Sequence, residues 1–586
     1  MCGIAAIFAY GASAPPVDPI EIEKITERMR PRGPDAGGTW ISPDTRVALG
    51  ARRLAIIDLT DEGTQPMTDV DGELRIVFNG EIYNYRELRA RLERLGARFH
   101  STTDTEVLLQ LYRHDGATMV ELLRGMFAFA IWDPRARRMF VARDPYGIKP
   151  LYFADDGQTF RAASTVKALL AGGCVGRALN PAGEAGFWLM GSVPEPHTIF
   201  ESIRAVEAGT SFFVDERGVH DARRYYSIAA TLKRGVLDEP AAHLVDPYVL
   251  VRELVTDSLR HHLIADVPVG AFLSSGIDSS ALVALATEAA GQPPRTVTLR
   301  FNEFRGGDLD EGPLADRFAH RIGSSHVTRL VERDEFLSDL PKLFDAMDQP
   351  TIDGTNTWFV SKAAAERGLK VAISGLGGDE LFGSYPSFRA LPRIVAAARM
   401  PFVVSAASQI TSNPKAKGVA RYGRTWGGAY LLKRGLFLPD DLPALMGADA
   451  AEEGLRRLSM IEHIADTIEP DPGTPFARVA SLEASLYMRN QLLRDTDWAS
   501  MAHSLEVRTP LVDAALLRQI APLLLVEKQR CKGHFANSPR NPLPDWLSER
   551  KKTGFSVPLV EWMNLPADGT STRMRSWARI VVEQWA

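Results

Sequence analysis

The chain has 586 residues, which is too long for a single hydrophobic core and predicts two or more domains. Its hydrophobic fraction of 45%, charged fraction of 24% and net charge of −5 are ordinary for a soluble globular enzyme and argue against a nucleic-acid-binding surface. The sequence shows no membrane-spanning stretch, no secretory signal and only 3 cysteines without CxxC spacing, so we expect no membrane partner, no disulfide scaffold and a cytoplasmic location.

Residues 1–228 are expected to form a strand-rich domain. Apolar runs such as "GIAAIF", "RIVFNGEIYN" and "MFAFAIWD" predict buried strands, and "YRELRARLERLG" predicts a helix that ends at a capping Gly96. The polar segment 229–245 is predicted to be an irregular linker. From 246 to 586 apolar strands alternate with helices, which predicts a parallel sheet covered on both faces. Residues 390–470 are expected to be mostly helical, and no chemistry is assigned to them.

Cys2 is the first candidate catalytic residue. If Met1 is removed, Cys2 carries a thiol and a free α-amine on one residue, and the amine can relay the proton of the thiol. A cysteine at this position is, by itself, more often incidental than catalytic. Four polar clusters interrupt the strands that follow: "RGPD" from Arg32, "RRLAIID" from Arg52, "FNGEIYN" from Phe78 and "STTDTE" from Ser101. Each cluster also has a purely structural interpretation, such as a turn or a helix N-cap.

Taken together, these clusters suit the hydrolysis of a side-chain amide by a thiol. The side-chain amide of Asn79 and the backbone N–H of Gly80 are suited to stabilise an oxyanion. Arg53 is suited to bind a substrate α-carboxylate, and Asp104 to bind a substrate α-ammonium. A substrate that has an amide, an α-carboxylate and an α-ammonium is glutamine.

Two loops of small residues in the second half follow predicted strands. "FLSSGIDSS" begins at Phe272 and leads into a helix, where backbone N–H groups can bind a phosphate. An ordinary strand-to-helix turn with a serine cap is the alternative. The second loop is "SGLGGDELFGSY", from Ser374. Asp278 and Asp379 are candidate ligands for Mg²⁺ bound to a pyrophosphate, since Mg²⁺ prefers a few carboxylates together with phosphate oxygens.

The motifs of the first half resemble the N-terminal-nucleophile glutaminase domain of class II amidotransferases. "MCGI", "RGPD", "RRLAIID", "FNGEIYN" and "DPYGIKPLYF" occur in the order of that family and cover about the first 215 residues. The resemblance implies that Cys2 is the mature N-terminus and the nucleophile, and that an oxyanion hole is formed by Asn79 and Gly80. It also implies a set of glutamine-binding residues: Arg53, Asn79, Gly80, Glu81 and Asp104.

The second half resembles asparagine synthetase B. "SSGIDSS" is similar to the ATP pyrophosphatase loop of that family, "SGLGGDE" to its GDE loop, and "MAHSLEVRTPLVD" and "RKKTGFSVPLVEW" extend the resemblance nearly to the C-terminus. In that family ATP adenylates a carboxylate, pyrophosphate leaves, and ammonia attacks the acyl-adenylate. Lys552 matches a lysine that stabilises charge on the phosphorus, and Asp278 and Asp379 match the metal site. The expected ATP-binding residues are Leu273, Ser274, Ser275, Gly276, Asp278, Ser279, Leu299, Ser374 and Gly375.

The resemblance implies the fold class and the domain boundaries. We expect an α+β N-terminal-nucleophile glutaminase domain with αββα layers over 1–228, the linker over 229–245, and an α/β parallel-sheet ATP pyrophosphatase domain, of the adenine nucleotide α-hydrolase-like type, over 246–586. ATP and Mg²⁺ are the expected cofactors. Glutamine, ATP and a carboxylate acceptor are the expected small-molecule partners, and a homodimer is compatible with the sequence without being specified by it.

Several positions depart from the family pattern. Ser275 replaces a glycine of the pyrophosphatase loop, which a small residue tolerates. Leu376 stands where glutamine-dependent asparagine synthetases carry a glutamate that serves formation of the β-aspartyl-adenylate. "DQPTIDGTN" stands where the family more often has "DEPxxDpS", and Trp498 stands where "DRxSMAH" places an arginine. The variants at Leu376 and in "DQPTIDG" resemble a branch found alongside glycan-assembly enzymes.

The departures leave the acceptor open between free aspartate, the family default, and another carboxylate such as a uronic acid. Two other enzyme classes are disfavoured: a phosphoribosyl amidotransferase would need an acidic phosphoribosyl loop, and a sugar isomerase-type aminotransferase would need paired sugar-binding repeats. A degenerate binding protein is the non-enzymatic alternative, and the intact Cys2, Asp278, Asp379 and Lys552 argue against it.

Overall fold

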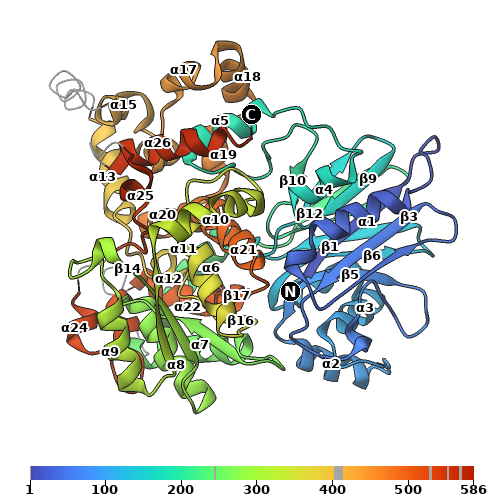
Figure 1. Ribbon diagram of the computed structural model, residues 1–586, viewed down its shortest axis with the longest axis horizontal. Helices are drawn as coiled ribbons and strands as arrows, with labels where there is room; N and C mark the ends of the chain where they lie inside the picture. The colour runs from blue at the N-terminus through green and yellow to red at the C-terminus, as the bar shows by residue number, and fades with distance from the viewer. Residues whose placement is uncertain are drawn as a thin grey trace.

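The computed structural model describes residues 2–242, 246–400, 414–526, 531–550, 553–565 and 570–585. Figure 1 shows the N-terminal part, in blue and cyan, beside a larger part that contains a separate sheet and most of the helices. No helix within these ranges is long and apolar enough to cross a membrane.

The N-terminal domain is built from two antiparallel sheets. The first has the strand order β10-β8-β9-β1-β3-β2 and the second the order β12-β11-β7-β6-β5-β4. The strands of the first sheet are β1 (Cys2–Ala9), β2 (Ala36–Ile41), β3 (Val47–Arg53), β8 (Tyr152–Asp155), β9 (Thr159–Ala163) and β10 (Arg204–Ala205). The strands of the second sheet are β4 (Met67–Thr68), β5 (Arg75–Ile82), β6 (Gly125–Asp133), β7 (Arg138–Arg143), β11 (Thr210–Asp215) and β12 (Gly218–Arg224).

Helices cover the outer face of each sheet, which gives the expected αββα layers. Helices α1 (Pro19–Arg28) and α4 (Val166–Gly172) contact the first sheet, and α3 (Asp104–Asp115), with α2 (Tyr85–Arg94) beside it, contacts the second. Strand β1 shows why: Ile4 and Phe8 belong to the apolar layer between the sheets, whereas Ala5 and Ile7 belong to the layer under α1. A strand with apolar residues on both faces is buried between two layers.

The second half contains a five-stranded parallel sheet in the order β15-β14-β13-β16-β17. Its strands are β13 (Val269–Phe272), β14 (Arg295–Phe301), β15 (His326–Val331), β16 (Val371–Ile373) and β17 (Glu506–Arg508). The helices around it are α7 (Pro247–His262), α8 (Ile277–Ala290), α9 (Gly312–Ile322), α10 (Arg333–Ala346), α11 (Thr355–Glu366), α12 (Gly378–Leu381), α22 (Ala514–Val526), α23 (Cys531–Asn537), α24 (Asp545–Ser548), α25 (Leu559–Met563) and α26 (Thr570–Val582).

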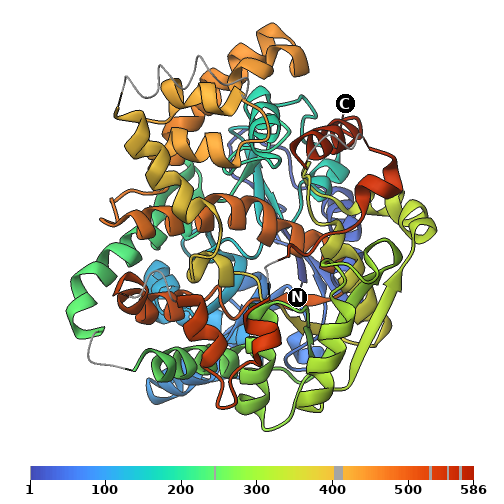
Figure 2. The same ribbon diagram turned by 90° about the vertical axis from the view of Figure 1, so that its left-hand side faces the viewer.

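The region from 390 to 470 is helical where it is described, as the sequence predicts. Its helices, with the one that enters it, are α13 (Ser387–Ala398), α15 (Pro414–Tyr422), α16 (Trp426–Arg434), α17 (Pro443–Met446), α18 (Ala448–Leu458) and α19 (Met460–Asp466). Figure 2 shows these orange and yellow helices gathered at one end of the molecule. Helix α5 (Pro181–Met190) reaches out of the N-terminal half and packs against α18.

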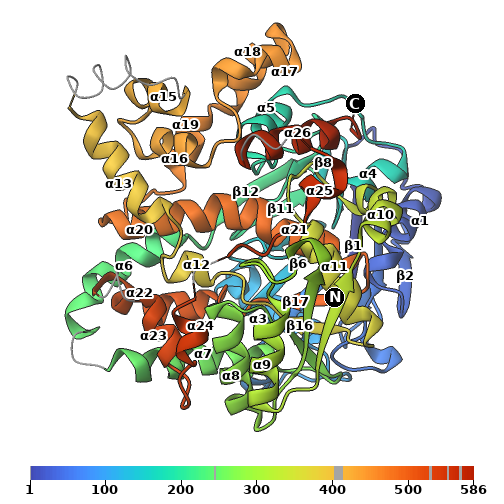
Figure 3. The ribbon, with the colours of Figure 1, turned by 60° about the vertical axis from the view of Figure 1, so that its left-hand side comes forward.

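A long helical run crosses the molecule from this end to the interface between the two halves (Figure 3). It consists of α20 (Pro475–Leu482), a π-helical stretch over Glu483–Leu493 and α21 (Arg494–Met501). A π-helical stretch widens the helix and is frequently found at functional sites. Here it precedes the residues that contact the N-terminal domain.

The segment 229–245, predicted to be an irregular linker, is instead largely helical. Helix α6 (Ile228–Ala242) covers most of it and packs against α22. The reason is an apolar stripe at helical spacing: Ile228, Ala229 and Leu232 are all buried. Polar residues lie between these positions, so the overall composition of the segment did not indicate a helix.

This packing predicts different effects for two leucines of α6. Leu232 is 1% exposed and Leu237 is 76% exposed. We expect Leu232→Ala to lower the free energy of unfolding by about 2–5 kcal/mol, because it leaves a cavity. Leu237→Ala, the matched control, should change it by no more than about 0.5 kcal/mol. Thermal and urea unfolding of both variants measure this, and equal effects would contradict the packing of α6.

Candidate functional site

Cys2 begins β1 and faces the layer between the two antiparallel sheets. Its backbone N–H donates to Oδ1 of Asn79 at 3.0 Å, so loss of Met1 would leave an amine at this nitrogen. Burial raises the pKa of the Cys2 thiol, and the nearby α-amino group acts in the opposite direction. Nδ2 of Asn79 is buried and has no acceptor within the described part of the chain. The Asn79 amide therefore orients the Cys2 nitrogen with one end and keeps a free donor at the other.

Gly80 follows Asn79 in β5 and lies close to the neighbouring strand. Its φ is +153°, and a Cβ atom built on it would lie 2.1 Å from the carbonyl oxygen of Met126. Only glycine fits this position. The sequence required glycine here for packing, whatever the further role of its N–H.

Arg53 lies directly opposite Cys2 in the β1–β3 ladder, so the two side chains lie on the same face of the sheet. Its guanidinium donates to the backbone carbonyls of Thr60 at 2.8 Å and Ile57 at 3.2 Å, and to that of Asp58. Arg53 thus shapes the loop beside Cys2, and its suggested contact with a substrate carboxylate depends on its remaining hydrogen-bonding capacity.

Two buried carboxyl groups complete this end of the site. Asp104 begins α3 after the N-cap Thr103, and its Oδ2 accepts from the N–H of Ile82 at 2.9 Å. Burial raises the pKa of Asp104 to about 6. Burial also raises the pKa of Glu81 well above its ordinary value, and the negative charge of Glu506 adds to this effect. Glu81 and Asp104 are therefore close, buried and able to respond to a cation.

Arg508 connects Glu81 to the parallel sheet of the second half. The guanidinium lies 3.4 Å from Oε2 of Glu81 and donates from Nε to Glu506 at 2.6 Å. The Arg508 side chain is fully buried. Its backbone carbonyl accepts from the N–H of Ser374, in the second small-residue loop, at 2.8 Å. Arg508 thus contacts both Glu81, a predicted glutamine-binding residue, and Ser374, a predicted ATP-binding residue.

The "RGPD" motif joins the two halves of the protein. Arg32 donates from Nε to the carbonyl of Cys2 at 3.3 Å and forms a bidentate pair with Asp497 of α21 at 2.7 and 3.1 Å. Asp35 pairs with Lys370 at 2.8 Å. Nζ of Lys149, from "DPYGIKPLYF", lies 3.6 Å from Asp497. These roles of Arg32, Asp35 and Lys149 were not anticipated, because the sequence does not say which distant residue faces them.

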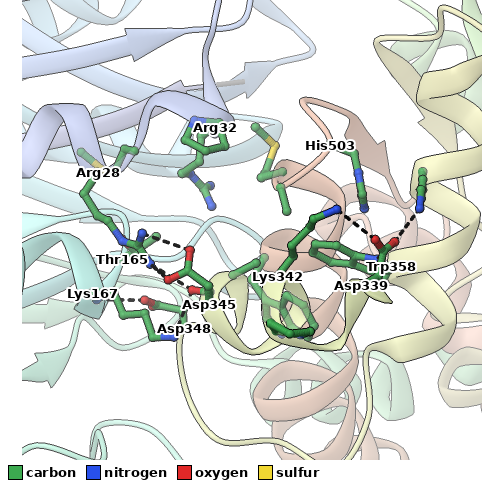
Figure 4. Close-up of a pocket in the computed structure, with 18 residues that line it drawn as sticks. Arg28, Arg32, Thr165, Lys167, Asp339, Lys342, Asp345, Asp348, Trp358 and His503 are labelled. Atoms are coloured by element: carbon green, nitrogen blue, oxygen red, sulfur yellow. Dashed lines mark hydrogen bonds and ion pairs between the residues drawn. The ribbon is translucent and has the colours of Figure 1, made fainter. Parts of the chain in front are cut away.

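A cavity of about 610 Å³ opens between the halves beside Arg32 (Figure 4). Its charged side chains are already paired: Arg28 with Asp345, and Asp339 with Lys362. Asp339 also accepts from Nε1 of Trp358 at 3.2 Å. These contacts make the cavity wall part of the domain interface.

A second cavity, of about 700 Å³, lies at the carboxyl ends of β13, β14 and β16. Ligands of open parallel sheets bind at such an edge. All the residues expected to bind ATP or the metal line this cavity: Leu273, Ser274, Ser275, Gly276, Asp278, Ser279, Leu299, Ser374, Gly375 and Asp379. Lys552 lies outside the described residues.

The two small-residue loops pack against each other at the base of this cavity. A Cβ atom on Gly378 would lie 2.4 Å from the carboxyl carbon of Asp278, and one on Gly375 would lie 3.0 Å from the N–H nitrogen of Ser279. Helix α8 begins at Gly276 without a side-chain cap, which leaves its first N–H groups available to an anion. The loops thus place the N-terminus of α8 beside two carboxylates.

Lys532 is a site residue that the sequence analysis missed. Its Nζ contacts the carboxylate of Asp278 and lies 2.9 Å from Oδ1 of Asp379. The two carboxylates therefore converge on one cation, and this arrangement fits Mg²⁺ as well as an ammonium group. No group of three or more His, Cys, Asp or Glu side chains suited to a metal occurs among the described residues. Phosphate oxygens or water would have to complete the coordination.

Arg550 and Glu311 are two further residues without a sequence signal. The Arg550 guanidinium contacts the hydroxyl of Ser275 and lies 3.7 Å from Glu311. The hydroxyl of Ser275, which replaces the family glycine, therefore has a partner. The substitution adds a contact at the mouth of the cavity.

Two of the departures from the family pattern, Leu376 and Gly354, line the same cavity, and a third, Trp498, packs against Gly354. Leu376 and Ile352 form an apolar part of it. Trp498 does not lie free: its Nε1 donates to Oδ1 of Asp495 at 2.9 Å. Gly354 has a φ of +92°, and a Cβ atom built on it would lie only 2.5 Å from the Trp498 indole. The glycine of "DQPTIDG" and the tryptophan of "DTDWASM" therefore fit each other.

Three carboxyl groups that line this cavity are buried, and the pKa of each is raised. Burial and the neighbouring carboxyl group of Asp353 raise the pKa of Asp495 to about 7. Burial and the charge of Asp379 raise the pKa of Glu380 to about 8. Burial also raises the pKa of Asp353. This side of the cavity can therefore exchange protons near neutral pH.

Comparison with known proteins agrees with this two-site arrangement. Residues 1–226 match the glutamine amidotransferase domain family, and residues 250–579 match the asparagine synthase family. The chain is 30% identical over its whole length to glutamine-hydrolyzing asparagine synthetase 1 of Bacillus subtilis, covering 90% of that protein.

Two further relatives differ in their names. The chain is 32% identical, over 96% of its length and 88% of the relative's, to a putative glutamine-hydrolyzing asparagine synthetase of Mycobacterium bovis. It is 31% identical, over 67% of its length and 60% of the relative's, to the amidase chry2 of Gibberella zeae. The matched domains and the full-length relatives show that the chain belongs to the glutamine-hydrolysing asparagine synthetase family and is a glutamine-dependent, amide-forming ligase.

Proposed function

We propose that the protein hydrolyses glutamine at Cys2 and uses the ammonia to amidate a carboxylate that ATP has activated in the second cavity. The observation that carries this proposal is the convergence of two separate sets of residues: Cys2 with Asn79 in one domain, and the small-residue loops with Asp278 and Asp379 in the other. Asp497 joins the two sets through Arg32.

In the glutaminase reaction, the α-amine of mature Cys2 takes the thiol proton, and the sulfur attacks the amide carbon of glutamine. Nδ2 of Asn79 and the N–H of Gly80 stabilise the resulting oxyanion. The buried Nδ2, which has no other acceptor among the described residues, supports this role. Glu81 and Asp104 bind the α-ammonium, and Arg53 binds the α-carboxylate.

In the synthetase reaction, the phosphates of ATP bind the N–H groups at the start of α8. Asp278 and Asp379 would hold Mg²⁺, which would neutralise charge on the phosphates. Lys532, whose ammonium contacts both carboxylates, would then lie beside the phosphates. Lys552 supports the same charge, as the family resemblance implies.

Ammonia needs a path that keeps it from water, since ammonium is not a nucleophile. A small hollow of about 30 Å³ supports such a path. It is lined by Tyr146, from the loop that also carries Lys149, and by Gly377 and Glu380, beside the second cavity. Most of its wall is apolar, including Leu511 and Met488. Its size suits one small molecule.

The acceptor that we propose is a carboxylate without an ammonium group next to the reacting carbon, such as a uronic acid. An apolar Leu376 cannot orient the ammonium of aspartate or accept a proton. Free aspartate is the second candidate, and the names of the relatives favour it. The wall formed by Leu376 and Ile352 is the feature that separates the two candidates.

The two-site arrangement predicts separable activities. We expect Cys2→Ala to abolish glutaminase activity and to leave amide formation from added ammonia intact, because the two reactions use different residues. Cys174→Ala, at an exposed cysteine, is the matched control and should retain both activities. Glutamate release and pyrophosphate release measure the two reactions. A folded Cys2→Ala protein that fails with ammonia would contradict separate sites.

The acceptor pocket predicts a substrate preference. Pyrophosphate release with ATP and glutamine should be weak with aspartate and stronger with glucuronate or galacturonate. Leu376→Glu should partly restore aspartate-dependent release, because a positioned acid–base group contributes on the order of 10²–10⁴-fold in rate. Leu376→Gln is the control, since glutamine has a shape similar to glutamate but carries no charge. Rapid wild-type turnover of aspartate at submillimolar concentration would show that the protein is an ordinary asparagine synthetase.

A further inference from the structure

Helix α21 presents acidic side chains to both halves of the protein. Asp497 pairs with Arg32, which in turn contacts the carbonyl of Cys2. Asp495, two positions earlier, lines the cavity that holds the ATP loops and Leu376. Residues two positions apart on a helix point in nearly opposite directions. Asp495 therefore points away from Asp497 and toward the cavity that holds the ATP loops.

The hydrogen-bond partners of Asp495 are neutral, so they favour its protonated form more than a cationic partner would. Its two oxygens accept neutral hydrogen bonds, from Nε1 of Trp498 at 2.9 Å and from Oγ1 of Thr351 at 2.7 Å. An arginine at position 498, as in the family pattern, would be three residues away on the same helix and would hold Asp495 ionised. Gly354 provides the space that the Trp498 indole needs.

The charged groups that face Asp495 act in opposite directions. Burial and the carboxyl group of Asp353 raise its pKa, and the guanidinium of Arg494 lowers it, with a net value of about 7. Arg494 is itself held by a hydrogen bond to the carbonyl of Val193 at 2.8 Å. Asp495 is thus a group in a substrate cavity that can take up and release a proton near neutral pH.

We propose that Asp495 is the base that takes a proton from ammonia as it attacks the activated acceptor, in a cavity where Leu376 supplies no carboxylate. This inference rests on the proposed function and names a catalytic residue of the same site. The replacements at 376, 354 and 498 then act together: Leu376 removes a carboxylate from the cavity, and Trp498, packed against Gly354, gives Asp495 a neutral partner in place of an arginine.

The proposed step is balanced. The nitrogen lone pair of ammonia forms a bond to the carbonyl carbon of the acyl-adenylate. The bond from that carbon to the AMP oxygen breaks, and its electron pair leaves with AMP. One N–H proton passes to the Asp495 carboxylate, which later releases it to water. The products are the amide, AMP and one proton.

Two half-reactions test this role in the full-length protein. ATP–pyrophosphate exchange without an ammonia source reports adenylation, and amide formation with added ammonia reports the second step; the acceptor is whichever of aspartate and glucuronate releases pyrophosphate. We expect Asp495→Asn to leave exchange within a few fold and to lower amide formation by about 10²–10⁴-fold. Asp495→Glu should recover part of that loss.

Asp339→Asn is the matched control. Asp339 is also buried and also accepts from a tryptophan Nε1, but it lies on the cavity between the domains. It should leave the ratio of the two half-reactions unchanged. Equal losses of exchange and amide formation in Asp495→Asn, or no loss of amide formation, would overturn the inference. Absence of pyrophosphate release with every acceptor would instead overturn the proposed function.

The pH dependence of amide formation provides a second readout. Trp498→Arg places a positive charge near Asp495 and should lower the apparent pKa of the acidic limb by 1–3 units, in line with the usual effect of an opposite charge at this range. Trp498→Phe removes the hydrogen bond without adding a charge, and should raise that apparent pKa or leave it in place. An acidic limb that is the same in all three proteins would contradict the role of Asp495.

A third measurement needs no acceptor. The pKa of Asp495 is raised from 3.8 to about 7 in the folded protein. Its protonated form therefore stabilises the fold fully below pH 3.8, and that stability is lost as the pH rises through about 7. The wild type should therefore lose stability relative to Asp495→Asn progressively between about pH 4 and about pH 7. Parallel stability curves for the two proteins would overturn the inference, whatever the acceptor.

Discussion

The carboxylate of Asp497 is the contact on which the rest of the arrangement depends. It receives the guanidinium of Arg32 at 2.7 Å and lies 3.6 Å from the ammonium of Lys149, and both partners come from the other domain. Arg32 also holds the carbonyl of Cys2. Removing one partner of such a buried pair costs about 3–5 kcal/mol, whereas the complete pair adds little net stability. Its value is positional: it fixes the nucleophile relative to α21 and hence to the second cavity.

The second cavity shows how a family site can change its chemistry while keeping its frame. The loops that would bind ATP pack through glycines at 375 and 378, so the phosphate side allows little variation. The rest of the site is different, because Leu376 and Gly354, which line the cavity, and Trp498, which packs against Gly354, all depart from the family pattern. Gly354 leaves room for the indole, and the indole replaces a charged partner of Asp495 with a neutral one. The altered residues are thus connected through packing and through one ionisable group.

Much of this could be predicted from the sequence, and the reason is local. Strand β1, the small-residue loops and the start of α3 are short stretches whose residue types specify both structure and chemistry. The αββα layers and the parallel sheet followed from such stretches and from the resemblance, and the matched families agree. Lys532, Arg550 and Asp495 could not be predicted, because each gains its meaning from residues that are distant in the chain. The prediction of an irregular segment over 229–245 was wrong, because the polar composition concealed the apolar stripe of α6. Arg53 faces Cys2, and it also holds the loop beside Cys2, which the sequence did not indicate.

The central claim is that ammonia passes from Cys2 to the second cavity without entering the solvent. Isotope transfer tests it most directly. The protein would be given glutamine labelled with ¹⁵N at the side-chain amide, together with ATP, the acceptor and an excess of unlabelled ammonium. The account predicts that the amide product carries mainly ¹⁵N and that added ammonium dilutes it little. A product whose ¹⁵N content equals that of the bulk ammonium would show that the two sites work independently and would contradict the account.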